Sequence, residues 1–193
     1  ESYHENGELH EQGSFKDGKL DGIYKYYHDN GQLIGKYIYE NGVMSDGPYE
    51  MYLKNGELLE KGAYKNGELD GPYESYHENG VLKEKLTYKL GLRHGSYEHY
   101  YENGQLEQKG TYKNRIRHGS FMWYYENGQL WEKCVYKNGE LDGLFVSYHE
   151  NGALKEKLTY KNNLANGFYQ LFWDNGFLQQ KGVFKDGQPV GSW

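Results

Sequence analysis

The chain has few of the aliphatic residues on which most small proteins depend for a core. Leu, Ile, Val and Phe make up about 19% of its 193 residues, near the level at which disorder is expected. The net charge is only -6, however, and the chain has 22 Tyr, 7 Phe and 4 Trp, whereas disordered chains are poor in aromatic residues. We therefore expect a folded protein that buries aromatic rings.

Other absences exclude whole classes of protein. The single cysteine, Cys134, rules out an internal disulfide. No apolar run approaches the roughly 20 residues of a membrane-spanning helix. A pI near 5.8 gives no general electrostatic reason to bind nucleic acid or anionic lipid, so we expect no nucleic-acid partner and regard membrane lipid as disfavoured. With only three Pro, no linker or domain boundary is expected, and residues 1–193 are interpreted as a single repeat domain.

The sequence does not determine the cellular compartment of the protein. There is no signal-peptide pattern, and the first residue is Glu1. Both a cytoplasmic protein and a fragment of a larger cell-surface or secreted protein agree with this.

A repeat of 24 residues, with one step of 25, runs through the chain. Asn-Gly recurs at Asn6-Gly7, Asn30-Gly31, Asn55-Gly56, Asn79-Gly80, Asn103-Gly104, Asn127-Gly128, Asn151-Gly152 and Asn175-Gly176. A second series, called here the marker glycines, comprises Gly22, Gly47, Gly71, Gly95, Gly119, Gly143, Gly167 and Gly191. Fixed periods of this length indicate a repeat architecture.

Three positions of every repeat are aromatic, counted from the marker glycine. In the repeat that starts at Gly71 they are Tyr73, Tyr76 and Tyr88, the second, fifth and seventeenth positions, and Trp193 is the last second-position ring. Tyr-rich runs bounded by turn residues predict strands, and Asn-Gly between two such runs predicts a hairpin with a type I′ turn. We expect about eight hairpins that form one elongated, curved, single-layer antiparallel sheet, an all-β repeat solenoid.

The Asn-Gly turn also predicts a register. A two-residue turn at Asn79-Gly80 places His77 opposite Leu82, Glu74 opposite Lys85 and Gly71 opposite Tyr88. One face then carries rings, Leu and Gly, and the other carries Glu and Lys. The fifth-position Tyr falls on the charged face, unless a bulge reverses its side; the sequence leaves both possibilities open.

This pattern resembles MORN repeats, and most closely the bacterial variant of the YwqK antitoxin type. The matching segments are Asp70–Gly80 and Tyr64–Gly71, and the His-Gly forms at 92–95 and 117–119 are similar to the general MORN form. The resemblance covers the whole chain. It implies a curved sheet with an aromatic groove, partner binding and a toxin-neutralising role. Leu90, Arg115 and Asn163 depart from the Asn-Gly of the second turn.

The sequence gives little support for a metal site or a catalytic site, and we expect neither a cofactor nor enzymatic activity. His4, His28, His77 and His149 share one repeat position, but equivalent residues of neighbouring repeats lie roughly 10 Å apart, too far to share a metal with bonds near 2 Å. The recurrent carboxylates, among them Glu84, Glu132 and Glu156, have equivalent surroundings, whereas general acid–base chemistry needs two different acids. Cys134 is interpreted as a buried small hydrophobe.

The repeats differ most from one another between Leu90 and Trp131. All three arginines lie there, in an otherwise acidic chain, together with additional histidines and large rings. The candidate binding residues are Arg93, His94, His99, Tyr101, Arg115, Arg117, His118, Trp123, Tyr125 and Trp131. Trp, Tyr and Arg are the usual anchors of protein interfaces. Drift of the repeat with Arg–Glu pairing is the alternative. A second patch of Phe168, Phe172, Trp173 and Phe177 is interpreted as shielding the end of the sheet.

Two classes of function follow. The first is a scaffold that binds another protein, an antitoxin or immunity-like role with a toxin-like or surface protein as partner. The alternatives are a glycan- or lipid-surface-binding module and a structural spacer of a larger surface protein.

Overall fold

The computed structural model describes residues 1–191 and is built entirely of β-strands and turns. Among these residues no helix is long and apolar enough to cross a membrane. The expected fold class, hairpin repeats in an open antiparallel sheet, is confirmed. Ser192 and Trp193 lie outside the described residues, so the ring expected at Trp193 is not placed. The single domain over residues 1–193 stays a prediction. The chain divides into two compact units, unit 1 of residues 1–92 and unit 2 of residues 93–193.

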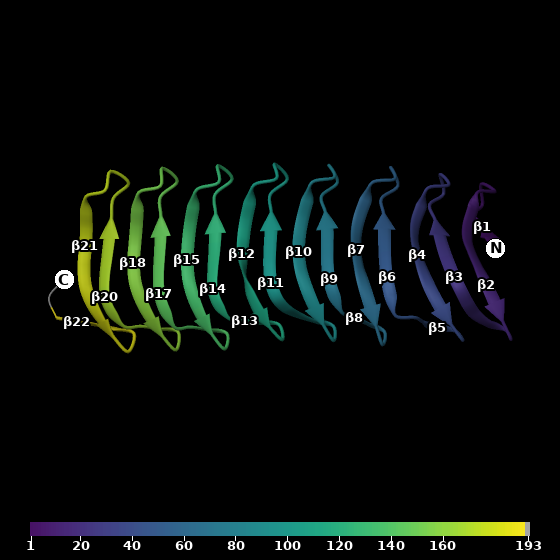
Figure 1. The fold of residues 1–193 in the computed structure, drawn as a ribbon. Helices are drawn as coiled ribbons and strands as arrows, with labels where there is room; N and C mark the ends of the chain where they lie inside the picture. The colour runs from purple at the N-terminus through teal and green to yellow at the C-terminus, as the bar shows by residue number, and fades with distance from the viewer. Residues whose placement is uncertain (192–193) are drawn as a thin grey trace. The chain divides into compact units, whose positions relative to one another are not determined.

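Unit 1 consists of hairpins whose strands lie side by side in one layer (Figure 1). The hairpins are β1–β2, β3–β4, β6–β7 and β9–β10. The bounds are β1 (Ser2–Tyr3), β2 (Leu9–Lys16), β3 (Lys19–Tyr27), β4 (Leu33–Glu40), β5 (Val43–Met44), β6 (Gly47–Tyr52), β7 (Leu58–Lys65), β8 (Glu68–Leu69), β9 (Gly71–Tyr76) and β10 (Leu82–Lys89).

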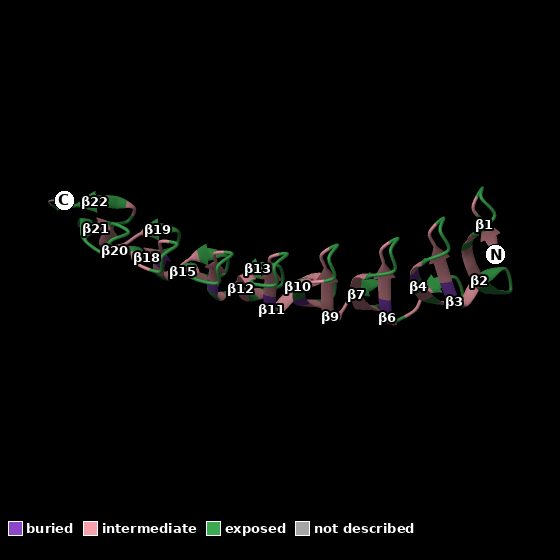
Figure 2. Cartoon of the chain, turned by 90° about the horizontal axis from the view of Figure 1, so that it is seen from above, coloured by how far each residue is buried: buried purple, intermediate pink, exposed green. Residues whose placement is uncertain are grey.

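Unit 2 repeats the same plan in the hairpins β11–β12, β14–β15, β17–β18 and β20–β21. The bounds are β11 (Leu92–Tyr100), β12 (Leu106–Lys113), β13 (Ile116–Arg117), β14 (Gly119–Tyr124), β15 (Leu130–Lys137), β16 (Glu140–Leu141), β17 (Gly143–Tyr148), β18 (Leu154–Lys161), β19 (Leu164–Ala165), β20 (Gly167–Phe172), β21 (Leu178–Lys185) and β22 (Gln188–Val190). In both units the loops are exposed and the buried residues lie within strands (Figure 2).

The type I′ turn predicted at Asn-Gly is wrong, although the hairpin is present. None of the eight Asn residues at these turns, all described, has a positive φ; only the following glycine does, as at Gly80 with φ 77°. The Gly80 N–H donates to the His77 carbonyl at 2.9 Å, and the His77 N–H donates to the Val81 carbonyl at 2.8 Å. This is the three-residue loop in which a type I turn is followed by a left-handed glycine.

The type I′ turn lies instead at the second connection of each repeat. Asn66 and Gly67 both have positive φ, 51° and 78°, and the flanking Lys65 and Glu68 pair directly. The departures from Asn-Gly keep this geometry, because Leu90 has φ 50° and Arg115 has φ 68°. The turn type therefore survives substitutions that cost free energy in the left-handed region.

The extra loop residue changes the register near the turn. Gly71 opposite Tyr88 and Glu74 opposite Lys85 are confirmed, but Leu82 pairs with Tyr76 and not with His77, because a bulge at Lys83 shifts the return strand. The fifth-position ring lies on the charged face, where the Tyr76 hydroxyl donates to Glu74 at 2.8 Å.

The two faces are therefore less segregated than predicted. Leu82 lies opposite Tyr76 on the charged face, and Glu84 lies opposite Ser75 on the face of the rings. The surface that carries the second-position rings is called here the ring face. The opposite surface is called the lysine face, after the lysines at the fourteenth position: Lys36, Lys61, Lys85, Lys109, Lys133, Lys157 and Lys181.

The core is a row of rings that meet edge to face. In unit 2 the ring centroids of Tyr97 and Tyr112, of Tyr112 and Phe121, and of Phe121 and Tyr136 are each 5.4 Å apart, with interplanar angles of 88°, 85° and 82°. Phe121 is fully buried. Its ring lies over Gly110, where a Cβ would collide with it. Such ring pairs are favoured geometries that add stabilisation to apolar burial.

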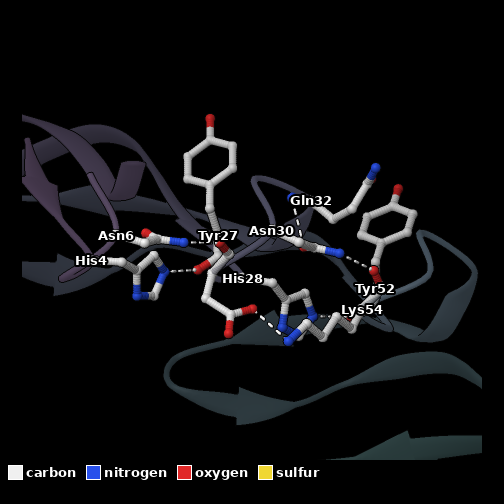
Figure 3. A network of polar contacts seen from close by, with 9 residues as sticks. His4, Asn6, Tyr27, His28, Asn30, Gln32, Tyr52 and Lys54 are labelled. Atoms are coloured by element: carbon white, nitrogen blue, oxygen red, sulfur yellow. Dashed lines mark hydrogen bonds and ion pairs between the residues drawn. The ribbon is translucent and has the colours of Figure 1, made fainter. Parts of the chain in front are cut away.

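Side chains at the Asn-Gly turns link repeats to their neighbours, as Figure 3 shows around His4 and His28. The Asn30 Oδ1 accepts from the Gln32 N–H at 3.1 Å, and the Asn30 Nδ2 donates to the Lys54 carbonyl of the next repeat at 2.7 Å. The His28 ring contacts the Tyr52 carbonyl of that repeat through Nε2 at 3.2 Å. The histidine column that could have suggested a metal site is therefore a ladder of backbone contacts.

These links should be measurable as stability. Asn30→Ala removes the local bond and the bond to the next repeat. Asn55→Ala removes only bonds within its own turn, because Asn55 donates to Glu57. We expect Asn30→Ala to lower the free energy of unfolding by about 0.5 to 1 kcal/mol more than Asn55→Ala. Both variants lose two hydrogen bonds, but the second bond of Asn30 joins two repeats, whereas that of Asn55 ends on an exposed carboxylate of the same turn. Urea unfolding of both variants measures this, and equal losses would contradict a role for the inter-repeat bond.

Glu74 connects two hairpins on the lysine face. Its carboxylate lies 2.8 Å from the Lys61 Nζ and 3.3 Å from the Lys85 Nζ. The bond from Lys61, followed by the bond from Tyr76, lowers the pKa of Glu74 to about 2.

The depressed pKa gives stability a defined pH dependence. A carboxyl group whose pKa is lower in the folded chain stabilises it above the ordinary value near 4.5, and the contribution is lost as the pH falls toward 2. Because the two lysines are about half exposed, we expect only about 1 kcal/mol. Urea unfolding between pH 7 and pH 2.5 should therefore show a smaller decline for Glu74→Gln than for the unmodified chain. Parallel declines would refute the assignment.

Candidate functional site

Arg117 is the centre of the candidate site. It lies on the ring face opposite Tyr112, because both pair across β12 and β13. Its guanidinium carbon lies 5.1 Å from the ring centroid of Phe121, 5.4 Å from that of Trp123 and 5.3 Å from that of Tyr136. Its Nη1 donates to the Tyr136 hydroxyl at 3.0 Å. The rings hold a planar cation in one orientation on an open face.

Arg93 occupies the equivalent position one repeat earlier. Its guanidinium carbon lies 5.4 Å from the Tyr97 centroid and 6.0 Å from the Tyr112 centroid. Two residues before the marker glycine, other repeats carry apolar residues, such as Leu69, Leu141 and Ala165. The two arginines therefore replace an apolar cover over the rings with cations.

Trp123 and His99 lie on the same face in the next row of side chains. The register places His99 opposite Gln108, and Gln108 opposite Trp123. The His99 Nδ1 lies 2.7 Å from a Glu107 carboxylate oxygen. The Gln108 Nε2 is buried and has no hydrogen-bond partner among the described residues. Arg93, His99, Arg117 and Trp123 are thus brought onto one face.

Half-buried carboxylates continue this row. Glu132 pairs with Trp123 on one side and with Ser147 on the other, and Glu156 follows opposite Ser147. Burial raises the pKa of Glu132, to which the charge of Glu156 also contributes, while Arg117 opposes the shift. Burial likewise raises the pKa of Glu156. Both shifts have the same direction.

The remaining predicted residues lie elsewhere. Tyr101 and Tyr125 belong to the ladder at the Asn-Gly edge, where their hydroxyls donate to the carbonyls of Tyr124 and Tyr148 at 2.8 and 2.9 Å. Trp131, 43% exposed, lies against Tyr125 with a centroid distance of 6.0 Å. The structure assigns the two tyrosines a structural role that sequence reasoning missed; the signal was their position in the histidine column.

His94, Arg115 and His118 lie at the opposite edge, by the type I′ turns. The His94 Nδ1 lies 3.1 Å from the Asn114 Oδ1. Arg115 and His118 are exposed, and their N–H groups donate to the carbonyls of Arg93 and Thr111. These side chains are separated from Trp123 by the length of the strand.

The second predicted patch is also divided. Phe168, 79% exposed, follows the marker glycine on β20, whereas Trp173 and Phe177 belong to the turn between β20 and β21. Cys134 is confirmed as a buried small side chain, 1% exposed, opposite Phe121. Among residues 1–191 no group of three or more His, Cys, Asp or Glu side chains could hold a metal ion.

Fold and site together define a β-hairpin repeat protein of the scaffold type, which presents rows of side chains on an open sheet. The family described as "MORN repeat variant" matches residues 1–17, 20–42, 45–66, 69–90, 93–114, 117–138 and 141–162. The chain belongs to this family. The hairpin β20–β21 follows the same plan although it lies beyond these segments.

Two further comparisons add little. No curated protein matches the chain. One solved structure, described as the crystal structure of TcdB2-TccC3-Cdc42, matches at 11% identity and a TM-score of 0.19. The match covers 92% of this chain and 14% of that one.

The buried thiol gives a test of the packing beneath the site. Burial raises the pKa of Cys134 to about 11. We expect no reaction with the thiol reagent DTNB at pH 8 in the folded chain, and one equivalent of reaction in 6 M guanidinium chloride, because the reacting species is the exposed thiolate. Rapid reaction of the folded chain would mean that this part of the ring face opens.

Proposed function

We propose that the chain is a non-enzymatic binding scaffold for another protein, and that Arg93, Arg117 and Trp123 on the ring face of unit 2 bind an acidic segment of that partner. The observation that carries this proposal is the replacement of an apolar position by arginine in two consecutive repeats whose backbone plan is unchanged. In a repeat protein, binding residues are expected at positions where the side chain differs between repeats while the backbone stays the same.

The chemistry of these residues supports an acidic ligand. A guanidinium stacked on rings loses little freedom when it binds, and its fork of N–H donors matches a carboxylate. Arg and Trp are also the residues most often found as energetic centres of protein interfaces.

The finer form of the proposal is an antitoxin-like role. It rests on the resemblance of the Asp70–Gly80 and Tyr64–Gly71 segments to the YwqK type. In this form the partner is a toxin-like protein whose acidic surface the scaffold covers, with no chemical step performed by the scaffold itself.

Substitutions taken from the chain's own repeats test the site with little disturbance of the fold. Arg93→Leu and Arg117→Leu copy Leu69 and Leu141, and Trp123→Ser copies Ser75 and Ser147. In a pull-down from the source organism, the triple variant should lose the partner that the unmodified chain captures. With the isolated partner we expect at least a 100-fold weaker affinity, because the variant removes three candidate anchors and two hot-spot residues at about 2 kcal/mol each already exceed the roughly 2.7 kcal/mol that this factor requires.

The control is a triple variant of unit 1, Leu20→Ala, Met51→Ser and Lys25→Gln, which shortens two side chains at the equivalent ring-face positions and removes one charge from the lysine face. Both triple variants should keep Tm within about 5 °C, since each substitution copies or shortens a side chain on an open face. Retained capture by the Arg93, Arg117 and Trp123 variant would refute this site. Binding to a glycan array in place of any protein would favour the sugar-binding alternative.

A further inference from the structure

We propose a second binding site, on the lysine face of unit 2, where Lys157 and Lys181 with Leu144, Phe168 and Val183 bind an acidic amphipathic helix of a partner protein. This proposal is independent of the ring-face site, because the two sets of residues lie on opposite faces of the sheet.

A groove exists at this place. A hollow of about 790 Å³ is lined by residues of β17, β18, β20 and β21, with Lys157, Lys181 and Gln170 on its polar side. Leu144, Phe168 and Val183 line its apolar side. Phe168 is 79% exposed and Leu144 is 44% exposed, so the apolar part is open to a ligand.

The chain itself shows that the charge of this groove is unusual. The lysine at the fourteenth position is opposed by an acid at the third position in earlier repeats: Lys61 lies opposite both Glu50 and Glu74, and Lys109 lies opposite Glu98. These neighbours compensate the lysine charge on the sheet surface.

In later repeats the lysine remains and the acid is lost. Lys133 lies opposite Met122 and Val146, and Lys157 lies opposite Val146 and Gln170. Lys181 lies opposite Gln170. None of these three lysines forms an ion pair within the described part of the chain. A row of uncompensated cations beside exposed apolar side chains is complementary to a ligand that is both acidic and apolar.

The spacing of the lysines favours a helix. Equivalent positions of adjacent repeats are two strand spacings apart, roughly 10 Å. Residues seven apart on an α-helix lie on one side, about 10.5 Å apart. An extended segment places side chains on one side about 6.8 Å or 13.6 Å apart, which does not match. A helix with acidic residues seven apart could therefore pair them with Lys133, Lys157 and Lys181. Apolar residues between the acids would fill the apolar side of the groove.

The test uses the full chain and a yeast-displayed library of random helical peptides. We expect selection to enrich peptides with acidic residues seven apart and apolar residues between them. Two variants should each weaken binding of the enriched peptides at least tenfold: Lys157→Gln with Lys181→Gln, which removes the cations, and Val146→Glu with Gln170→Glu, which restores the acids of earlier repeats.

The control is Lys65→Gln with Lys89→Gln, the same charge change at exposed strand ends of unit 1, which should leave binding unchanged. The triple variant of the ring face should also bind normally, so failure of one site is distinguishable from failure of the other. No enrichment, or equal binding by all variants, would overturn the proposal. It would also be overturned by binding of vesicles with 30% phosphatidylserine that depends on Lys157 and Lys181 when no peptide is enriched, since the groove would then serve a lipid surface.

Discussion

The structure depends on hydrogen bonds that run from one repeat to the next along the Asn-Gly edge. A single-layer sheet has no second layer to cover it, so each repeat must gain its stability from its neighbours. The Asn side chain supports its own turn with one atom and bonds the next repeat with the other, as Asn6, Asn30 and Asn151 do. The residue two positions before the Asn contributes a second contact from His or Tyr, at His4 and Tyr125 for example. The turn is therefore one place where the repeats are joined, in addition to the strand pairs between neighbouring hairpins, such as Lys61 opposite Glu74.

A single-layer sheet also lacks an interior between two layers, and the aromatic rings provide the buried core in its place. Large side chains laid over glycine and over one another bury themselves at Tyr49, Tyr97 and Phe121, with exposures of 3%, 6% and 0%. This explains how a chain with so little aliphatic content folds. Because the rings supply the buried core, many other positions on the two faces can change without loss of the sheet. Binding residues can therefore differ from repeat to repeat at those positions.

Much of the fold was predictable because it follows from period and pairing. The hairpins, the Glu–Lys pairs and the rings across from glycine follow from spacing alone, as Tyr49 opposite Gly62 shows. The turn type was not predictable, since Asn-Gly occurs at both connections and is compatible with two geometries. The error of one residue at the turn misplaced Leu82, and with it the composition of the faces, because a shift of one residue moves a side chain to the other side.

The candidate site was predictable in part for the same reason. Departures from the repeat identified Arg93, Arg117 and Trp123. The register brings Arg117 and Trp123 to one face, and the Arg93 guanidinium lies over the Tyr112 ring of that face. Sequence distance alone could not separate them from Tyr101, Tyr125 and the loop histidines, which lie at the edges of the sheet. The uncompensated lysines of unit 2 were not predicted from the sequence. What distinguishes them is the loss of the acid at the third position of the repeat, and only the pairing of the strands shows that this acid would lie opposite the lysine.

The central claim is that positions shared by the repeats build the sheet and that departures in unit 2 bind partners. A substitution scan of the full chain that reads protease resistance and partner binding in parallel tests it directly. The account predicts that the Asn-Gly and ring positions change protease resistance, while Arg93, Arg117, Trp123, Lys157 and Lys181 change binding alone. Binding-specific effects concentrated at the shared positions would contradict it.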